Sequence, residues 1–369
     1  EGRETLSSGN YSHTEGYQST ASAAYSHAEG ILTHASGLHS RAEGISTLTV
    51  GNNSHAEGNS TSTQAPGSHA EGSGSIAGTS ATIGLNSHAE GATTQTVGNS
   101  SHAEGQNTTT HGFASHAEGE LTSASGSHSH AEGYQTGTTG SHSHAEGFKT
   151  ITLGNYAHAE GSGSTASGNH SHAEGWATLA TGDHSHAEGA GGTVSGTGAH
   201  GEGGIVLASG DYSHAEGEGS ATGPFSHAEG RGTAGGSHSH AEGTRTFSFA
   251  AFSHAEGDGS RTFETGSHAE GLNTEARALG SHTEGSSSIT YGSSSHAEGL
   301  GSIASGSFSH AEGQTSLAIG IAAHSEGRIS TASGNYSHAE GNTTQATGYA
   351  SHAEGANTIA SGQNSHAEG

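Results

Sequence analysis

Residues 351–362 read Ser-His-Ala-Glu-Gly-Ala-Asn-Thr-Ile-Ala-Ser-Gly, and variants of this stretch return along the whole chain. The glutamate of the His-Ala-Glu-Gly motif falls first at Glu15 and last at Glu368. Of the 25 intervals between neighbouring motif glutamates, 22 span fourteen positions, as from Glu15 to Glu29. A fixed period without a break in composition predicts a repeat array rather than several globular domains. We therefore expect residues 1–369 to form a single continuous array.

Three intervals break the period. The interval from Glu71 to Glu90 is five positions too long and predicts an insertion near residues 73–84. The two intervals that meet at Glu229 are each one position too short and predict one-residue deletions near residues 217–240. The Ser-His-Ala-Glu-Gly segments that flank these changes are intact. Variation in length is therefore tolerated in only one half of the repeat.

The composition excludes several classes of protein. The chain has 65 glycines among 369 residues, which disfavours helices, and a hydrophobic content of 27%, which cannot fill an ordinary globular core. Eight lysines and arginines against 35 acidic residues leave no basic patch for nucleic acid. No apolar run approaches the roughly 20 residues that span a bilayer, so we expect no membrane-spanning segment. There is no cysteine, which removes disulfide and thiolate chemistry.

Each period contains two related halves of the form x-x-[Ser/Thr]-x-Ala-x-Gly. Alternation with period two indicates a short strand, and a glycine followed by two free positions, as in residues 51–53, indicates a turn. Two strands and two turns per period predict an all-β, parallel β-solenoid with about 14 residues per coil and about 26 coils. The residue before the motif histidine is serine or alanine in all 26 repeats, and the residue after it is always small. This face must line a narrow interior, so the histidine and glutamate are expected to point outward.

The repeat resembles the head repeat of YadA-type trimeric autotransporter adhesins, and similar repeats occur in tail-fibre and surface proteins of phages and other viruses. The resemblance covers essentially the whole chain. It implies a left-handed β-roll, a homotrimer around a common axis, and a structural role as an adhesin head or fibre shaft. It also implies an extracellular place on a cell or virion surface. Further candidate partners are a host-surface receptor or glycan, and other copies joined end to end as a filament.

One departure from the adhesin pattern concerns the outward positions of the constant strand. Adhesin heads commonly carry valine and isoleucine there, whereas this chain carries histidine in 25 repeats and glutamate in 26, with Arg41 replacing one histidine. Glutamates stacked at strand spacing repel one another without cationic partners, so we expect these residues to form an interchain ladder. The glutamates are then expected to raise the histidine pKa values and to make the assembly most stable at mildly acid pH. The residues selected for this ladder are His27, Glu29, His55, Glu57, His102, Glu104, His116, Glu118, His172, Glu174, His338 and Glu340.

A metal site is the alternative use of the same residues. Three histidines that meet on a threefold axis could ligate an ion such as Zn²⁺. The motif lacks the His-Glu-x-x-His spacing of helical zinc sites, so no cofactor or metal is assigned. The candidate axial ligands are His102, His116, His130, His144, His172 and His186. The corresponding alternative function is a monomeric or laterally associating solenoid that binds metal, mineral or ice through its His/Glu face.

Catalysis is not expected. Alternation along the strand places the motif serine and histidine on opposite faces, so a nucleophile and its base cannot meet. No catalytic residue is therefore proposed. The turn position before the motif serine is aromatic or histidine in 14 of 26 repeats. These rings form either a packed rim between coils or a stripe that binds a sugar or receptor.

Overall fold

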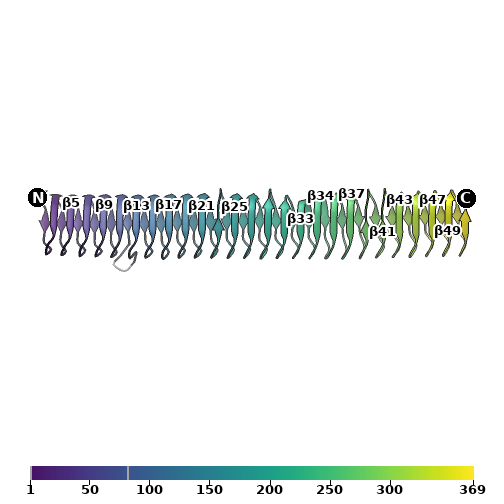
Figure 1. Ribbon diagram of the computed structural model, residues 1–369, viewed down its shortest axis with the longest axis horizontal. Coiled ribbons are helices and arrows are strands. Elements are labelled where there is room, and N and C mark those ends of the chain that lie inside the picture. The colour runs from purple at the N-terminus through teal and green to yellow at the C-terminus, as the bar shows by residue number, and fades with distance from the viewer. Residues whose placement is uncertain (1, 81–82) are drawn as a thin grey trace. The chain divides into compact units, whose positions relative to one another are not determined.

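The computed structural model describes residues 2–80 and 83–369, and the chain divides into two compact units, Glu1–Ala190 and Gly191–Gly369. Each unit consists of short strands joined by tight turns (Figure 1). The described residues contain no helix, and hence none long and apolar enough to cross a membrane. The predicted all-β class is confirmed.

Each unit is a parallel β-solenoid in which one coil corresponds to one sequence repeat. A strand that begins at the first position of the motif, here called the long strand, has four or five residues in most coils and is followed by a short strand of two residues. Equivalent strands of successive coils pair in parallel and in register, so that His102 in β15 (His102–Gln106) lies opposite His116 in β17 (His116–Glu120). The register shifts only in the shortened coils of the described chain, between Arg231 and Thr233. The predicted solenoid, its coil length and its two strands per coil are confirmed.

The strands of the first unit alternate between the two types. The long strands, preceded by β1 (Gly2–Arg3), are β3 (His13–Tyr17), β5 (His27–Ile31), β7 (Arg41–Ile45), β9 (His55–Asn59), β11 (His69–Ser73), β13 (His88–Ala92), β15, β17, β19 (His130–Tyr134), β21 (His144–Phe148), β23 (His158–Ala159), β25 (His172–Trp176) and β27 (His186–Ala190). The short strands are β2 (Leu6–Ser7), β4 (Thr20–Ala21), β6 (His34–Ala35), β8 (Leu48–Thr49), β10 (Ser62–Thr63), β12 (Ile76–Ala77), β14 (Gln95–Thr96), β16 (Thr109–Thr110), β18 (Ser123–Ala124), β20 (Gly137–Thr138), β22 (Ile151–Thr152), β24 (Thr165–Ala166) and β26 (Leu179–Ala180).

The second unit repeats this arrangement, with the two types merged at β33 and β34. Its long strands are β29 (His200–Gly203), β31 (His214–Gly217), β33 (His227–Ala234), β34 (His240–Ser248), β35 (His254–Asp258), β37 (His268–Leu272), β39 (His282–Thr283), β41 (His296–Ala297), β43 (His310–Gln314), β45 (His324–Arg328), β47 (His338–Asn342), β49 (His352–Ala356) and β51 (His366–Glu368). The short strands are β28 (Thr193–Val194), β30 (Leu207–Ala208), β32 (Ser220–Ala221), β36 (Arg261–Thr262), β38 (Glu275–Ala276), β40 (Ile289–Thr290), β42 (Ile303–Ala304), β44 (Leu317–Ala318), β46 (Thr331–Ala332), β48 (Gln345–Ala346) and β50 (Ile359–Ala360).

The interior of the coils is filled by alanine, serine and threonine. Ala103 is fully buried, and Ser101 is 2% exposed. The hydroxyl of Thr110 donates to Ser101 Oγ at 2.9 Å, and Ser101 Oγ donates to the Gly98 carbonyl at 2.7 Å. These hydroxyls are thus satisfied inside a space that is too narrow for larger residues, whereas the buried Oγ1 atoms of Thr108 and Thr122 have no hydrogen-bond partner in the described chain. The predicted inward face is confirmed.

The motif glycine is required by close backbone approach. Gly119 has φ of +106°, and a Cβ atom at this position would lie 2.1 Å from the carbonyl oxygen of Gly133 in the next coil. A second glycine column lies before the turn, where a Cβ atom on Gly98 would lie 1.9 Å from the Gly112 oxygen. The motif column, which is glycine in every coil, cannot accept a side chain without separating the coils. The second column is less strict, because it holds Ala23, Ala65, Ala250, Glu264 and Ala278 in five coils.

The irregular coils keep the long strand and change the segment after it. In the first unit Gly78 and Gly84 lie next to each other, since a Cβ atom on Gly84 would lie 2.3 Å from Gly78 Cα, and β12 stays paired with β10 and β14. Ala81 and Thr82, within the predicted insertion, lie outside the described residues. In the second unit, Gly219 and Gly232 take inward positions that serine or threonine fills in most other coils. A Cβ atom on Gly232 would lie 2.5 Å from the Ala241 oxygen, so the shortened coils need glycine there.

Candidate functional site

The most regular exterior feature is the His/Glu ladder, by which we mean the motif histidines and glutamates of the long strands. The histidine rings stack on one another in successive coils, with ring centres 4.6–5.0 Å apart, as for His102 and His116 at 4.8 Å. In the first unit the stack runs from His55 to His186 and is separated from His13 and His27 by Arg41. In the second unit it runs from His200 to His366.

In most coils the glutamate lies beside the histidine of its own coil, as in the pairs that begin at His116, His130 and His172. The distance from His27 Nε2 to Glu29 Oε2 is 3.3 Å, within hydrogen-bonding range. In most other coils the corresponding distance is longer, as for His116 and Glu118 at 3.6 Å. His116 side-chain exposure is 34%. The ladder is therefore half-buried, and most of its histidines and glutamates touch at distances longer than a short hydrogen bond.

The histidine Nε2 atoms are enclosed. Among the described residues, the Nε2 atoms of His69, His88, His102, His116 and His130 are inaccessible to solvent and have no hydrogen-bond partner in the chain. Leaving a buried polar atom unpartnered costs about 1–3 kcal/mol. This face therefore gains free energy from any group outside the single chain that reaches these nitrogens.

The residues selected from the sequence for the interchain ladder all lie on this exterior face. The pairs beginning at His27, His55, His116 and His172 have Nε2–Oε2 distances between 3.3 and 3.9 Å. His102 and His338 stack between their neighbours in the same register. Glu104 and Glu340 likewise pair in register with the glutamates of adjacent coils. The structure of one chain leaves the interchain role itself a prediction.

The prediction that the glutamates raise the histidine pKa values is wrong for the single chain. Burial of the ring lowers the pKa of His102 below 6.5, and the charges of His88 and His116 lower it further. Glu104 and Glu90 raise this pKa, but by less than the other groups lower it. The pKa is lowered, with burial as the largest cause, for His69, His116, His130, His172, His227, His254, His268, His282, His296, His310 and His338 as well.

The candidate metal ligands His102, His116, His130 and His144 belong to compact ligand groups within one chain. His102, Glu104 and His116 offer three ligand atoms within 4.8 Å of one another, and His130, Glu132 and His144 form an equivalent group. His172 lies in the same stack at 4.7 Å from His186. The structure thus brings together a His-Glu-His set along one chain, which the sequence analysis did not consider because it placed the ligands around a threefold axis.

The rings at the turn position form a second ladder, on the exposed rim. Tyr156 stacks between His142 and His170 with ring centres 4.9 and 4.8 Å away. Tyr156 has a left-handed backbone with φ of +56°, a conformation that bulky side chains rarely adopt. Tyr156 is 55% exposed, but its neighbours cover both ring faces. Rim packing is therefore supported, since a sugar would need an open ring face.

An arginine–aromatic patch in the second unit, on the second half of the repeat, was not predicted from the sequence. The guanidinium of Arg261 lies 5.5 Å from the ring centre of Phe247, and that of Arg277 lies 5.5 Å from Phe263. Glu275 forms ion pairs with both arginines. Alignment of successive repeats would have found these columns, because residues one period apart lie directly opposite each other. Both guanidinium groups are already engaged by Glu275 and by an aromatic ring, which fits side-chain packing better than binding of an anion.

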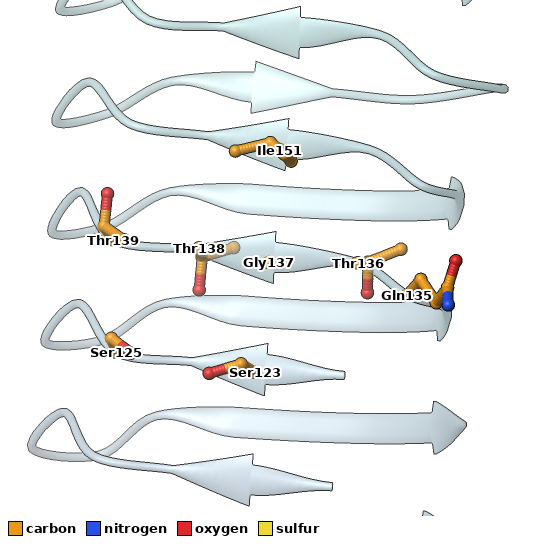
Figure 2. A pocket seen from close by; sticks show the side chains of 8 residues that line it. All are labelled: Ser123, Ser125, Gln135, Thr136, Gly137, Thr138, Thr139 and Ile151. Atoms are coloured by element: carbon orange, nitrogen blue, oxygen red, sulfur yellow. The ribbon is translucent and has the colours of Figure 1, made fainter. Parts of the chain in front are cut away.

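Hollows on the surface are open and lined by small polar residues. Figure 2 shows one in the first unit, where Gly137 lies between Ser123 and Ile151 on neighbouring short strands. The missing side chain of Gly137 creates this hollow, and Thr136 and Thr138 border it. It holds no group that could act as an acid, base or metal ligand. The His/Glu ladder therefore remains the candidate site.

Comparison with known proteins adds no assignment, because neither a protein-family model nor a curated protein matches this chain.

Proposed function

We propose that this chain is a structural element of a surface fibre, either a fibre shaft or an adhesin head, and that it has no enzymatic role. In this proposal the solenoid is a left-handed β-roll, and three copies pack through their His/Glu ladders. The resemblance to adhesin head repeats supports an extracellular place on a cell or virion, where a receptor or glycan would be the external partner. End-to-end joining of trimers would extend the fibre.

The observation that carries this proposal is the constancy of one exterior face. Glutamate occupies all 26 motif positions and histidine occupies 25, while the outward positions of the short strands vary freely. Packing inside the coil cannot require this constancy, because the histidine and glutamate side chains lie outside it. A partner whose surface repeats with the same period would require the same residues in every coil. An identical chain has that period.

The small core supports association as well. The largest fully buried side chains are Val194 and Val206, and the remainder of the interior is alanine, serine and threonine. Large apolar residues lie mostly on the exterior, such as Trp176 at 64% exposure. Burial of apolar surface contributes about 25 cal/mol per Å², so a thin coil gains little by itself. Packing of three chains increases the buried area for each.

Sedimentation equilibrium of the full chain in a chelating buffer tests the proposal. A trimer would have a mass of about 109 kDa, three times the 36.2 kDa of one chain. A mass of one chain at all concentrations would overturn the trimer and favour the monomeric solenoid. Ice binding is the least supported form of that alternative, because recurring threonines such as Thr33 and Thr47 are fully buried.

A further inference from the structure

The His/Glu ladder repeats one set of potential metal ligands along a single chain. In successive groups, two histidines from neighbouring coils and the glutamate of the first coil bring three ligand atoms within 4.8 Å of one another. Five of these groups are His69/Glu71/His88, His88/Glu90/His102, His102/Glu104/His116, His116/Glu118/His130 and His130/Glu132/His144. Both ligand types come from one face, so no partner chain is needed to complete a group.

The nitrogen atoms of these groups have no competing partner in the described chain. His116 Nε2 and His130 Nε2 are enclosed and accept or donate no hydrogen bond. The carboxylate oxygen of Glu118 lies 3.6 Å from His116 Nε2, which is beyond a short hydrogen bond. Each group thus combines two imidazole nitrogens with an adjacent carboxylate that balances the charge of a cation.

We propose that the His/Glu ladder binds divalent transition-metal ions such as Zn²⁺, each held by two histidines of successive coils and the glutamate between them. Imidazole and carboxylate are ordinary zinc ligands at about 2.0–2.2 Å, and a water molecule would complete the tetrahedron. At these bond lengths two ligand atoms lie roughly 3.4 Å apart. The stacked rings, whose centres lie 4.8 Å apart for His102 and His116, must therefore tilt toward each other, which their half-exposed position allows.

The sharing of histidines fixes the stoichiometry. His102, for example, belongs both to the group with Glu90 and to the group with Glu104. Because Nε2 of one histidine binds a single ion, neighbouring groups exclude each other. Saturation is therefore expected at about one ion for every two coils. This ratio distinguishes an ordered ladder from weak binding of an ion at every histidine.

The test is titration of the chelator-treated full chain with Zn²⁺ by calorimetry, and with Co²⁺ by visible absorption, which reports nitrogen ligation and tetrahedral geometry. The ladder variant replaces His102, His116, His130 and His144 by Gln. The matched control replaces the same number of stacked turn histidines, His128, His142, His170 and His184, which have no glutamate between them. We expect the ladder variant to lose about two to three ions and the control to lose none.

Three results would overturn the inference: no saturable binding, equal losses in both variants, or full stoichiometry in the ladder variant. If the ladder variant does not fold, Glu104→Gln, Glu118→Gln and Glu132→Gln together keep the rings and must still weaken zinc binding. An unchanged affinity in that variant counts against the proposed site. The mass in chelator measures trimer formation separately, so failure of metal binding and failure of the proposed fibre function are distinguishable.

Discussion

The two strands of a coil share the same interior but differ in their exteriors. On the inside, Ala117 of the long strand and Ala124 of the short strand are both fully buried. On the outside, the long strand shows histidine and glutamate in nearly every coil, whereas the short strand shows residues as different as Leu48, Gln95 and Gly137. The constraint of the narrow interior therefore acts on both strands, while the constraint on the exterior acts on one.

This difference separates two causes of repetition. Coil stacking explains the inward alanines and the glycine columns, because those positions contact the next coil directly. It does not explain the His/Glu ladder, whose enclosed nitrogens and lowered histidine pKa values are costs to the single chain. A feature that is repeated although it costs stability is best explained by an interaction beyond the chain.

The largest effect is expected where the coils approach most closely. Gly119→Ala places a Cβ atom 2.1 Å from the Gly133 oxygen at a φ of +106°. The substitution should destabilise the first unit by at least about 2 kcal/mol. Gly137→Ala is the matched control on the short strand, because its Cβ atom meets only the Ser123 oxygen at 4.0 Å. Thermal melts should show a clear loss for the first variant and no loss for the second; similar melts would contradict the assigned packing.

A core substitution should have the next largest effect. Ala173 is fully buried on the long strand, so Ala173→Leu overpacks the coil and should cost about 1–3 kcal/mol. Thr165→Leu changes an outward position on the short strand and should stay within about 0.5 kcal/mol of the parent. Urea unfolding of both variants checks the comparison. If Ala173→Leu leaves the free energy of unfolding unchanged, the interior of the coil must be wider than it is in the structure.

The pH dependence of stability should follow the histidine ladder. Because the folded-state pKa of His102 and its equivalents lies below 6.5, the unfolded chain binds protons more readily than the folded chain as the pH falls. The free energy of unfolding is therefore highest, as far as these histidines are concerned, above pH 6.5, where they are neutral in both states. It decreases as the pH falls below that value. Melting temperatures in chelator should therefore decrease from pH 7 to pH 5. A maximum at mildly acid pH would instead show that the glutamates dominate, as an interchain pairing would allow.

The smallest effect is expected at the rim. Tyr156→Asn removes stacking on His142 and His170, worth about 0.5–1.5 kcal/mol, but relieves a left-handed conformation that asparagine tolerates. These terms oppose each other, so the melting temperature should change little. A large loss would mean that the turn rings, and not only the glycine columns, hold neighbouring coils together.

Much of the fold could be predicted from the sequence, because it follows from the period of the repeat and from the size of the side chains. The fixed spacing of the motif and the restriction of positions such as Ala103 to small residues are enough to define the coil and its interior. The left-handed backbone at Tyr156 was not predicted from the sequence. It is a property of the turn and not of ring stacking, because Ser100 and Ala114 are left-handed at the same position without a ring. The direction of the His102 pKa shift was not predicted either. It depends on how deeply the ring is buried and how close the neighbouring rings lie, and the alternation of residues along a strand gives neither quantity.

Chemical labelling of one coil tests the central claim most directly. The chain has no cysteine, so His116→Cys and Ser123→Cys each introduce one thiol, on the long-strand and short-strand exteriors of the same coil. Both positions are partly exposed in the single chain. If the His/Glu ladder is an interface, a maleimide should modify the thiol at position 116 much more slowly in native protein, and both thiols equally in urea. Equal rates in native protein would contradict the claim that this face is covered by a partner.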